Sequence, residues 1–201
     1  MTRLLIATHN IHKAAEFRSL LEGSGIEVVT LDAFPSIEPV DEDEPSLEGN
    51  ALKKARHVFE KSGLASVADD TGLEVYYLNG EPGVYSSRYS GPGATYDSNC
   101  RKLLGALQGV PPRRRRARFR CVLAFVAPPN YVRTAEGICE GTILEAKRGT
   151  QGFGYDPLFL PAEHRETFAE MIPSLKNRIS HRGRALEALK PELLKYFTLH
   201  P

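Results

Sequence analysis

The chain opens with a continuous apolar run that gives way to helical periodicity, and this change of period constrains the fold more than any other feature. Leu4-Leu5-Ile6-Ala7 is closed by polar residues, which is typical of a strand buried on both faces. From Lys13 onward, apolar residues recur at helical spacing until Gly23 or Gly25 ends the segment. The sequence therefore predicts a strand, a short loop and a helix in direct succession.

Further along the chain, predicted strands first alternate with helices and later pair as hairpins. This order indicates an α/β fold with a mixed sheet. The chain has 201 residues, no internal repeat and no long linker, so we expect one domain over residues 1–201, with room for two lobes. The expected strands are 26–30, 64–68, 73–78, 119–127, 131–140 and 158–160, and the expected helices run from 47 to a stop at 63, from 97 or 98 to 108, and near 180–189.

The charges of the chain nearly cancel, which excludes a strong overall field. Lys plus Arg count 26 and Asp plus Glu count 25, for a formal net charge of +1. Attraction to a nucleic-acid backbone or an acidic membrane needs a larger positive charge. The one strong basic run, Arg113-Arg114-Arg115-Arg116 with Arg118 and Arg120, contains no aromatic residue except Phe119, so we interpret it as a solvated or weak polyanion patch. We expect no membrane partner and no specific nucleic-acid partner.

The cysteines and the N-terminal segment indicate in which cellular compartment the protein works. Cys100, Cys121 and Cys139 form no CxxC pair and leave one cysteine over, which fits structural thiols in a reducing compartment. The first apolar run is too short for a secretory signal, and no later run approaches the roughly 20 apolar residues of a membrane-spanning helix. We expect a cytoplasmic protein.

A short polar segment, Thr8-His9-Asn10-Ile11-His12-Lys13, lies between the first predicted strand and helix. Backbone N–H groups and the positive end of the helix dipole are expected there, together with a hydroxyl, an amide and an ammonium. That combination predicts an anion-binding site, although an ordinary loop with a helix N-cap fits the segment about equally well. The segment is neither a Walker loop nor a dinucleotide fingerprint, since GxxxxGK[ST] and GxGxxG are both missing from it.

Two adjacent aspartates, Asp69 and Asp70, are predicted at the end of an apolar strand, in a turn completed by Thr71-Gly72. Parallel sheets place their binding sites at such strand ends. Adjacent carboxylates repel each other unless a cation or a proton lies between them, and ligands that are all oxygen favour Mg²⁺ or Mn²⁺. A turn with solvated acids is the alternative. The acidic run Asp41-Glu42-Asp43-Glu44 is either a solvated face or the source of one more carboxylate for the same metal.

The segment Gly152-Phe153-Gly154-Tyr155-Asp156-Pro157 combines two glycines with two aromatic rings and a carboxylate. Glycines let the backbone approach a ligand and aromatic faces stack on planar rings, so we interpret this loop as a base-stacking platform. Polar side chains before the last predicted helix either donate to a carbonyl-bearing ring or form a helix start with exposed charges. These are Lys176, Ser180, His181, Arg182 and Arg184.

Five segments together resemble the inosine/xanthosine triphosphate pyrophosphatase family, also called the Ham1-like group. They occur in family order over nearly the whole chain, so the set is much more specific than any one motif. The segments are residues 7–16 (ATHNIHKAAE), 68–75 (ADDTGLEV), 82–91 (PGVYSSRYSG), 152–159 (GFGYDPLF) and 180–186 (SHRGRAL).

The resemblance implies a Mg²⁺-dependent hydrolase, with Mn²⁺ as the other candidate metal, that converts ITP, dITP and XTP to the monophosphate and pyrophosphate. It also implies a homodimer, an elongated mixed β-sheet flanked by helices, and a site in a central cleft between two lobes.

The resemblance also implies roles for particular residues. Asp70 is the expected proton acceptor and a metal ligand, with Asp69 in support. Glu42 is the expected second carboxylate, with Asp41 as the alternative, and Lys13 is the expected catalytic cation that stabilises the leaving pyrophosphate. The expected substrate-binding residues are Thr8, His9, Asn10, Ile11, His12, Lys13, Thr71, Phe153, Gly154, Tyr155, Asp156, Lys176, His181 and Arg182.

Two positions depart from the family pattern, which often has Gly at position 9 and Ser at position 71. His9 makes the phosphate loop bulkier, whereas Thr71 keeps the hydroxyl. Two other functions fit parts of the chain: a Maf-like pyrophosphatase acting on other modified or pyrimidine nucleotides, and a nucleic-acid-binding module that uses the basic run. A panel of triphosphates separates the first from the family reaction, and salt-dependent binding to duplex DNA or RNA identifies the second.

Overall fold

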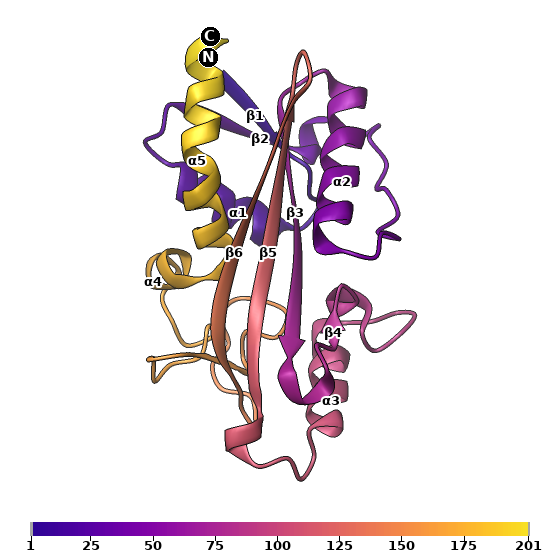
Figure 1. Cartoon of the computed structure of the whole chain (residues 1–201), viewed down its shortest axis with the longest axis vertical. Helices are drawn as coiled ribbons and strands as arrows, with labels where there is room; N and C mark the ends of the chain where they lie inside the picture. Colours follow the sequence, from indigo (N-terminus) through magenta and orange to yellow (C-terminus); the bar gives the residue numbers. More distant parts are fainter. Residues whose placement is uncertain (1, 201) are drawn as a thin grey trace. The chain divides into compact units, whose positions relative to one another are not determined.

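Seven strands form one mixed sheet in the computed structural model, which describes residues 2–200. They are β1 (Thr2–Ile6), β2 (Ile26–Thr30), β3 (Ser66–Val75), β4 (Pro82–Gly83), β5 (Arg116–Ala127), β6 (Tyr131–Ile143) and β7 (Phe159–Pro161). The order is β2-β1-β3-β5-β6-β7, with β4 beside β3 (Figure 1). Strand β1 pairs in parallel with β2 and β3, whereas the β3–β4 and β6–β7 pairs are antiparallel. The predicted α/β fold with a mixed sheet is confirmed.

The described α-helices begin and end largely where the sequence predicts. They are α1 (Ile11–Leu21), α2 (Leu47–Ser62), α3 (Tyr96–Ala106), α4 (Pro173–Ile179) and α5 (His181–Leu199). Ser46 caps α2 by accepting a hydrogen bond from Gly49 N at 3.0 Å, and Gly63 ends the same helix in the left-handed region at φ 69°. Helix α4 was not predicted, and α5 extends well beyond the predicted 189, because Pro191 lies within α5 without ending it.

The chain divides into two compact units that interleave along the sequence. The first unit comprises residues 2–70, 121–137 and 182–200, and the second comprises residues 71–120 and 138–181. Each unit has its own cluster of buried apolar side chains. The single domain over residues 1–201 and the central cleft stay predictions.

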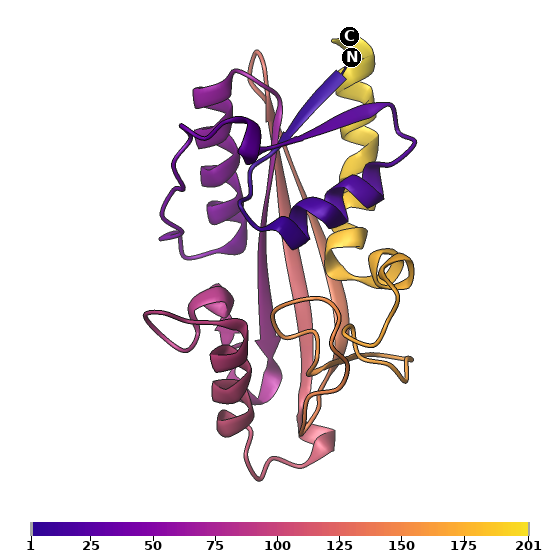
Figure 2. The ribbon, with the colours of Figure 1, turned by 180° about the vertical axis from the view of Figure 1, so that it is seen from behind.

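In the first unit, helices lie on both faces of the sheet (Figures 1 and 2). Phe17 of α1 and Leu186 of α5 are buried in one cluster with Leu4 of β1 and Leu123 of β5, so α1 and α5 cover the same face. Helix α2 lies on the other face and buries Leu47, Ala51, Ala55 and Val58 along one stripe.

In the second unit, α3 and the segments around β7 share one apolar cluster with β3 and β5. Leu103 of α3 and Phe159 of β7 are fully buried in it, and the Phe119 ring of β5 lies 4.7 Å from the Phe159 ring. This cluster fixes the loop that precedes β7, which contains the predicted base platform.

The predicted boundary at the aspartates is also wrong. The sequence predicts a turn at residues 69–72 between two strands, but β3 runs without interruption from Ser66 to Val75. Charged side chains in the middle of a buried strand are costly unless they are paired. Asp69 and Asp70 are both paired with cations, so the strand continues through them.

The sequence predicts that the basic run is a solvated or weak polyanion patch, but three of its arginines form ion pairs or hydrogen bonds within the chain. Arg115 is 3% exposed and donates to the carbonyl oxygens of Leu107, Ile143 and Leu144, all at 2.8 Å. Arg118 and Arg120 both pair with Glu74 of β3. The run therefore holds the second unit together at these three positions.

The cysteines agree with a further expectation. Cys100, Cys121 and Cys139 are buried and form no disulfide, which fits a structural role. Over residues 2–200, no helix combines the length and the hydropathy that crossing a bilayer requires.

Candidate functional site

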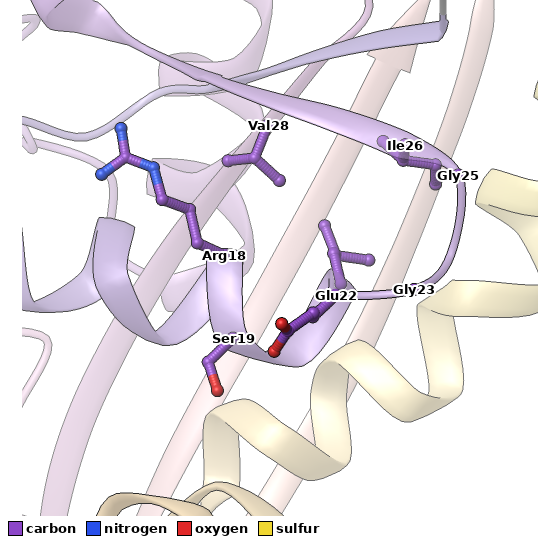
Figure 3. A pocket seen from close by; sticks show the side chains of 8 residues that line it. Arg18, Ser19, Glu22, Gly23, Gly25, Ile26 and Val28 are labelled. Atoms are coloured by element: carbon purple, nitrogen blue, oxygen red, sulfur yellow. The ribbon is translucent and has the colours of Figure 1, made fainter.

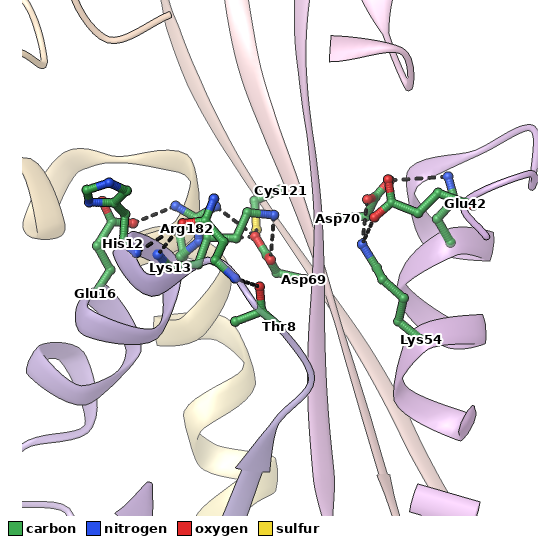
Figure 4. A network of polar contacts seen from close by, with 12 residues as sticks. Thr8, His12, Lys13, Glu16, Glu42, Lys54, Asp69, Asp70, Cys121 and Arg182 are labelled. Carbon is green, nitrogen blue, oxygen red and sulfur yellow. Dashed lines mark hydrogen bonds and ion pairs between the residues drawn. The ribbon is translucent and has the colours of Figure 1, made fainter. Parts of the chain in front are cut away.

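Asp69 and Asp70 are neighbours on β3, and alternation along a strand directs their side chains to opposite faces of the sheet. Asp69 has the parity of Val67, which is buried with α1 and α5, and it points to that side. Asp70 points to the side of α2 (Figure 4). Asp69 and Asp70 therefore pair with different cations, and no single ion lies between their two carboxylates.

Asp69 is the centre of a buried ion-pair network. Lys13 Nζ lies 2.8 Å from Asp69 Oδ1, and Arg182 donates to Asp69 Oδ2 through Nη2 at 2.7 Å and Nε at 3.1 Å. Arg182 Nη1 also pairs with Glu16 of α1 at 2.5 Å. Burial alone would raise the pKa of Asp69, but Lys13, Arg182 and Lys54 hold that pKa well below its usual range. The network ties β3 to the start of α1 and the start of α5.

The segment before α1 is closed by its own side chains. Asn10 is the N-cap of α1, and its Oδ1 accepts from His12 N at 3.0 Å and Lys13 N at 3.3 Å, while Thr8 Oγ1 accepts from Asn10 N at 3.1 Å. Two of the N–H groups predicted to bind an anion are thus engaged by Asn10. His9, Ile11 and His12 are exposed. The anion-binding elements that remain on the surface of this segment are the half-buried Thr8 and Lys13 side chains.

Asp70 and Glu42 converge on one ammonium. Lys54 Nζ lies 2.7 Å from Asp70 Oδ1 and 2.6 Å from Glu42 Oε1. Burial raises the pKa of Asp70, and the Lys54 charge offsets only part of that effect. Burial alone would lower the pKa of Lys54, but Asp70 and Glu42 raise it. Asp41, the alternative second carboxylate, is exposed.

The donor set around Lys54 fits a small divalent ion. Two carboxylate oxygens already converge on one positively charged atom, and Mg²⁺ is commonly held by one or two protein carboxylates, with water and substrate phosphates as the other ligands. Among residues 2–200, no group of three or more His, Cys, Asp or Glu side chains gathers in a metal-binding arrangement.

Sequence reasoning missed Lys54, Asn50 and Glu16. Lys54 and Asn50 lie one turn apart on α2, with Ala51 and Ala55 beside them, so Asn50 belongs to the buried stripe of the helix and the half-buried Lys54 lies at its edge. Polar residues on an otherwise apolar stripe are a signal that was available in the sequence. Glu16 gives no such signal, because an acidic residue on a helix is ordinarily solvated.

The predicted base platform in the second unit is a tight loop around Asp156. Asp156 is 3% exposed, and its Oδ2 accepts from Phe153 N at 2.9 Å and Lys176 Nζ at 2.7 Å. Gly152 has φ 73°, and a Cβ there would lie 2.1 Å from Asp156 Oδ2, so only glycine fits. Phe153 and Gly154 are half-buried, whereas Tyr155 is 4% exposed and donates to Ser86 O at 2.9 Å. Phe153 is therefore the aromatic ring of this loop that a planar ligand can reach.

The other predicted binding residues lie in different surroundings. Lys176 is buried, with Nζ 4.9 Å from the centre of the Phe153 ring. The His181 ring stacks on Phe119, with ring centres 4.5 Å apart and planes 19° apart. Thr71 is half-buried on β3 in the second unit. Arg182, predicted with Lys176 and His181, belongs instead to the Asp69 network of the first unit.

A separate pocket lies where α1 turns into β2 (Figure 3). Its lining has one carboxylate, Glu22, and one guanidinium, that of Arg18, which donates to Thr30 Oγ1 at 3.4 Å. None of the predicted site residues lines this pocket, so it is not the candidate site.

Comparison with known proteins gives one consistent result. The family model described as Ham1 family matches residues 4–192. A curated protein from Desulfotalea psychrophila, named dITP/XTP pyrophosphatase, is 47% identical over 196 residues, which cover 96% of this chain and 87% of that protein. A protein of the same name from Desulforamulus reducens is 46% identical over 198 residues, covering 98% of each chain. The solved structure titled as a HAM1 protein from Coxiella burnetii has a TM-score of 0.85 and 39% identity, and the match covers 97% of this chain and 100% of that one.

Proposed function

Because the chain belongs to the Ham1 family, we propose that it hydrolyses ITP, dITP and XTP to the nucleoside monophosphate and pyrophosphate. The observation that supports this most strongly is in the first unit. There the convergent carboxylates of Glu42 and Asp70 and the ammonium of Lys54 lie on one side of β3, and Lys13 lies at the start of α1 on the other side. The Lys13 charge acts on Asp70 across β3 and opposes the rise of its pKa. Carboxylates that share a cation, together with ammonium groups within such electrostatic range, suit a triphosphate with its metal.

Glu42 and Asp70 would hold a divalent ion, for which we propose Mg²⁺, with Mn²⁺ as a substitute. When bound, such an ion supplies positive charge to the phosphate oxygens as the reaction proceeds. Both carboxylates present oxygen ligands, which Mg²⁺ and Mn²⁺ prefer.

The chain's own residues carry out the other steps of the proposed reaction. Asp70 orients a water molecule toward the α-phosphorus and accepts its proton, and burial, which raises the pKa of Asp70, makes it a better base than an exposed aspartate. Lys13 and the Thr8 hydroxyl bind phosphate oxygens, and Lys13 stabilises the pyrophosphate that leaves. Asp69 holds Lys13 in place through their 2.8 Å ion pair.

For base recognition we propose Phe153 and Lys176 of the second unit. Phe153 stacks on the purine, and Lys176, positioned by Asp156, donates to O6. Adenine has an amino group at C6, so the Lys176 N–H aimed at that position would face a donor in place of an acceptor, which costs about 1–3 kcal/mol for a buried group and more for a charged one. The base-binding roles of His181, Arg182 and Thr71 stay predictions.

A substrate panel tests the proposal. The protein is incubated with ITP, dITP, XTP, ATP, GTP and pyrimidine triphosphates, with and without Mg²⁺, and the products are identified by ³¹P NMR. We expect pyrophosphate from the deaminated purines, only with the metal. Equal turnover of ITP and ATP would refute the base-recognition part, and a preference for pyrimidine nucleotides would favour the Maf-like reaction.

Assembly and location stay predictions as well. We propose a homodimer in the cytoplasm, and light scattering after size-exclusion chromatography measures the mass directly. A species of 22.3 kDa, the mass of one chain, would contradict the dimer.

A further inference from the structure

Asn50 is a buried polar residue in α2 that the proposed reaction does not use. It is 0% exposed, on the same stripe as Ala51 and Ala55. Asparagine is a weak helix former, and burying its amide is unfavourable unless the polar atoms form hydrogen bonds. An apolar residue would suit this buried position better, so the presence of asparagine must be explained by the hydrogen bonds that its amide forms.

All the polar atoms of the Asn50 amide are engaged. Oδ1 accepts from Glu44 N at 3.0 Å, and Nδ2 donates to Glu44 O at 3.5 Å and to Asp70 Oδ2 at 3.4 Å. The reversed amide would place an oxygen against the Asp70 carboxylate and a donor against a backbone N–H. Only the stated orientation is therefore compatible with both neighbours.

Asn50 and Lys54 act on the same two partners from one face of α2. They are four residues apart, and each touches both Asp70 and the acidic loop before α2. Lys54 binds Asp70 Oδ1 and Glu42, whereas Asn50 binds Asp70 Oδ2 and the backbone of Glu44. Asn50 thus holds Asp70 Oδ2, while Asp70 Oδ1 shares the Lys54 ammonium with Glu42.

We propose that Asn50 is a positioning residue that holds Asp70 and the Glu42 loop in register, so that their two carboxylates bind one divalent ion. This inference rests on the proposed function, since it assigns the same two ligands. Partners that orient metal ligands typically contribute about 10- to 100-fold to metal affinity or activity. A role limited to satisfying a buried amide would stabilise the fold without affecting the metal.

Mn²⁺ titration of the nucleotide-free protein, followed by the loss of the free-ion EPR signal, tests the proposal. Asn50→Leu should weaken Mn²⁺ binding about 10- to 100-fold. The matched control is Ser46→Ala, which removes the α2 cap at the same junction of loop and helix but no contact with Asp70. Unchanged affinity in Asn50→Leu, or equal weakening in both variants, would overturn the proposal.

A measurement on the unmodified chain covers the case in which Asn50→Leu does not fold. The side-chain NH₂ signals of Asn50 are followed by ¹⁵N NMR during Mg²⁺ addition. They should shift as Asp70 takes up the ion, and signals that stay in place under saturating Mg²⁺ would overturn the proposal. Neither test uses a nucleotide. Failure of the proposed function therefore appears separately, as a lack of pyrophosphate release from ITP.

Discussion

Replacing Lys54 with methionine should make the protein bind a divalent ion more tightly, although it removes part of the candidate site. The Lys54 ammonium lies between the two carboxylates that we assign to the metal, 2.6 Å from Glu42 and 2.7 Å from Asp70. A metal ion at these oxygens must displace this charge or bind beside it. Methionine keeps most of the side chain's volume and removes only the competing charge.

The structure gives the size of the effect. Two unit charges about 4 Å apart interact by about 4 kcal/mol at an effective dielectric of about 20. The Lys54 side chain is 13% exposed and can move aside, so only part of that repulsion is relieved by the substitution. A gain of about 1.4–2.8 kcal/mol corresponds to roughly 10- to 100-fold tighter binding.

Mn²⁺ titration at pH 8, without nucleotide, measures the change. Lys53→Met is the matched control, since Lys53 is the neighbouring residue and pairs with the exposed Asp43. Its Mn²⁺ affinity should equal that of the unmodified chain. Mn²⁺ should also raise the melting temperature of Lys54→Met more than that of the control, because two uncompensated carboxylates gain a cation. A folded Lys54→Met protein with unchanged or weaker Mn²⁺ affinity would refute the assignment of Glu42 and Asp70 to one ion.

Three other substitutions probe the remaining parts of the site. Asp70→Asn should lower kcat for dITP by about 100-fold or more with a smaller change in KM, and near-normal turnover would show that Asp70 is not the base. Asp69 has a lowered pKa, so its contribution to stability is present above its ordinary value of 3.8 and is lost as the pH falls through the lowered pKa. Asp69→Asn should therefore reduce the free energy of unfolding at pH 7 by about 3–5 kcal/mol. It should also flatten the decline of that free energy in acid, as urea titrations from pH 7 down to about pH 2 would measure; equal stability at pH 7 would contradict the network. Phe153→Leu should raise KM for dITP about 5- to 160-fold, since base stacking is worth about 1–3 kcal/mol, and an unchanged KM would exclude Phe153 as the stacking residue.

Strand β2 and helix α2 of the first unit follow from local pattern, and the sequence predicts them well. The expected strand 26–30 has the observed bounds of β2, and Gly63 ends α2 as expected. These elements are determined by hydrophobic period and by end signals that lie within the element itself. Local information is sufficient for them.

The aspartate pair shows where local information ends. Asp69-Asp70-Thr71-Gly72 has the composition of a turn, yet it lies inside β3. The cations that make this possible come from α1, α2 and α5, and Arg182 is 113 residues away from Asp69 in the sequence. No pattern near residue 70 shows that these charges will be neutralised.

The acidic loop shows the same limit. Sequence reasoning left Asp41 and Glu42 as alternatives, because both precede α2. The structure places Glu42 beside Lys54, whereas Asp41 is exposed. This choice depends on how the loop folds back over α2, where Asn50 holds Glu44, and that contact is not encoded in the acidic run itself.

The central claim is that water attacks the α-phosphorus of a deaminated purine nucleotide and that pyrophosphate leaves. The most direct test is turnover of dITP in H₂¹⁸O with Mg²⁺, followed by mass spectrometry of both products. We expect one ¹⁸O atom in dIMP and none in pyrophosphate. Label in pyrophosphate or in free phosphate, with unlabelled nucleotide, would place the attack at another phosphorus and refute attack at the α-phosphorus.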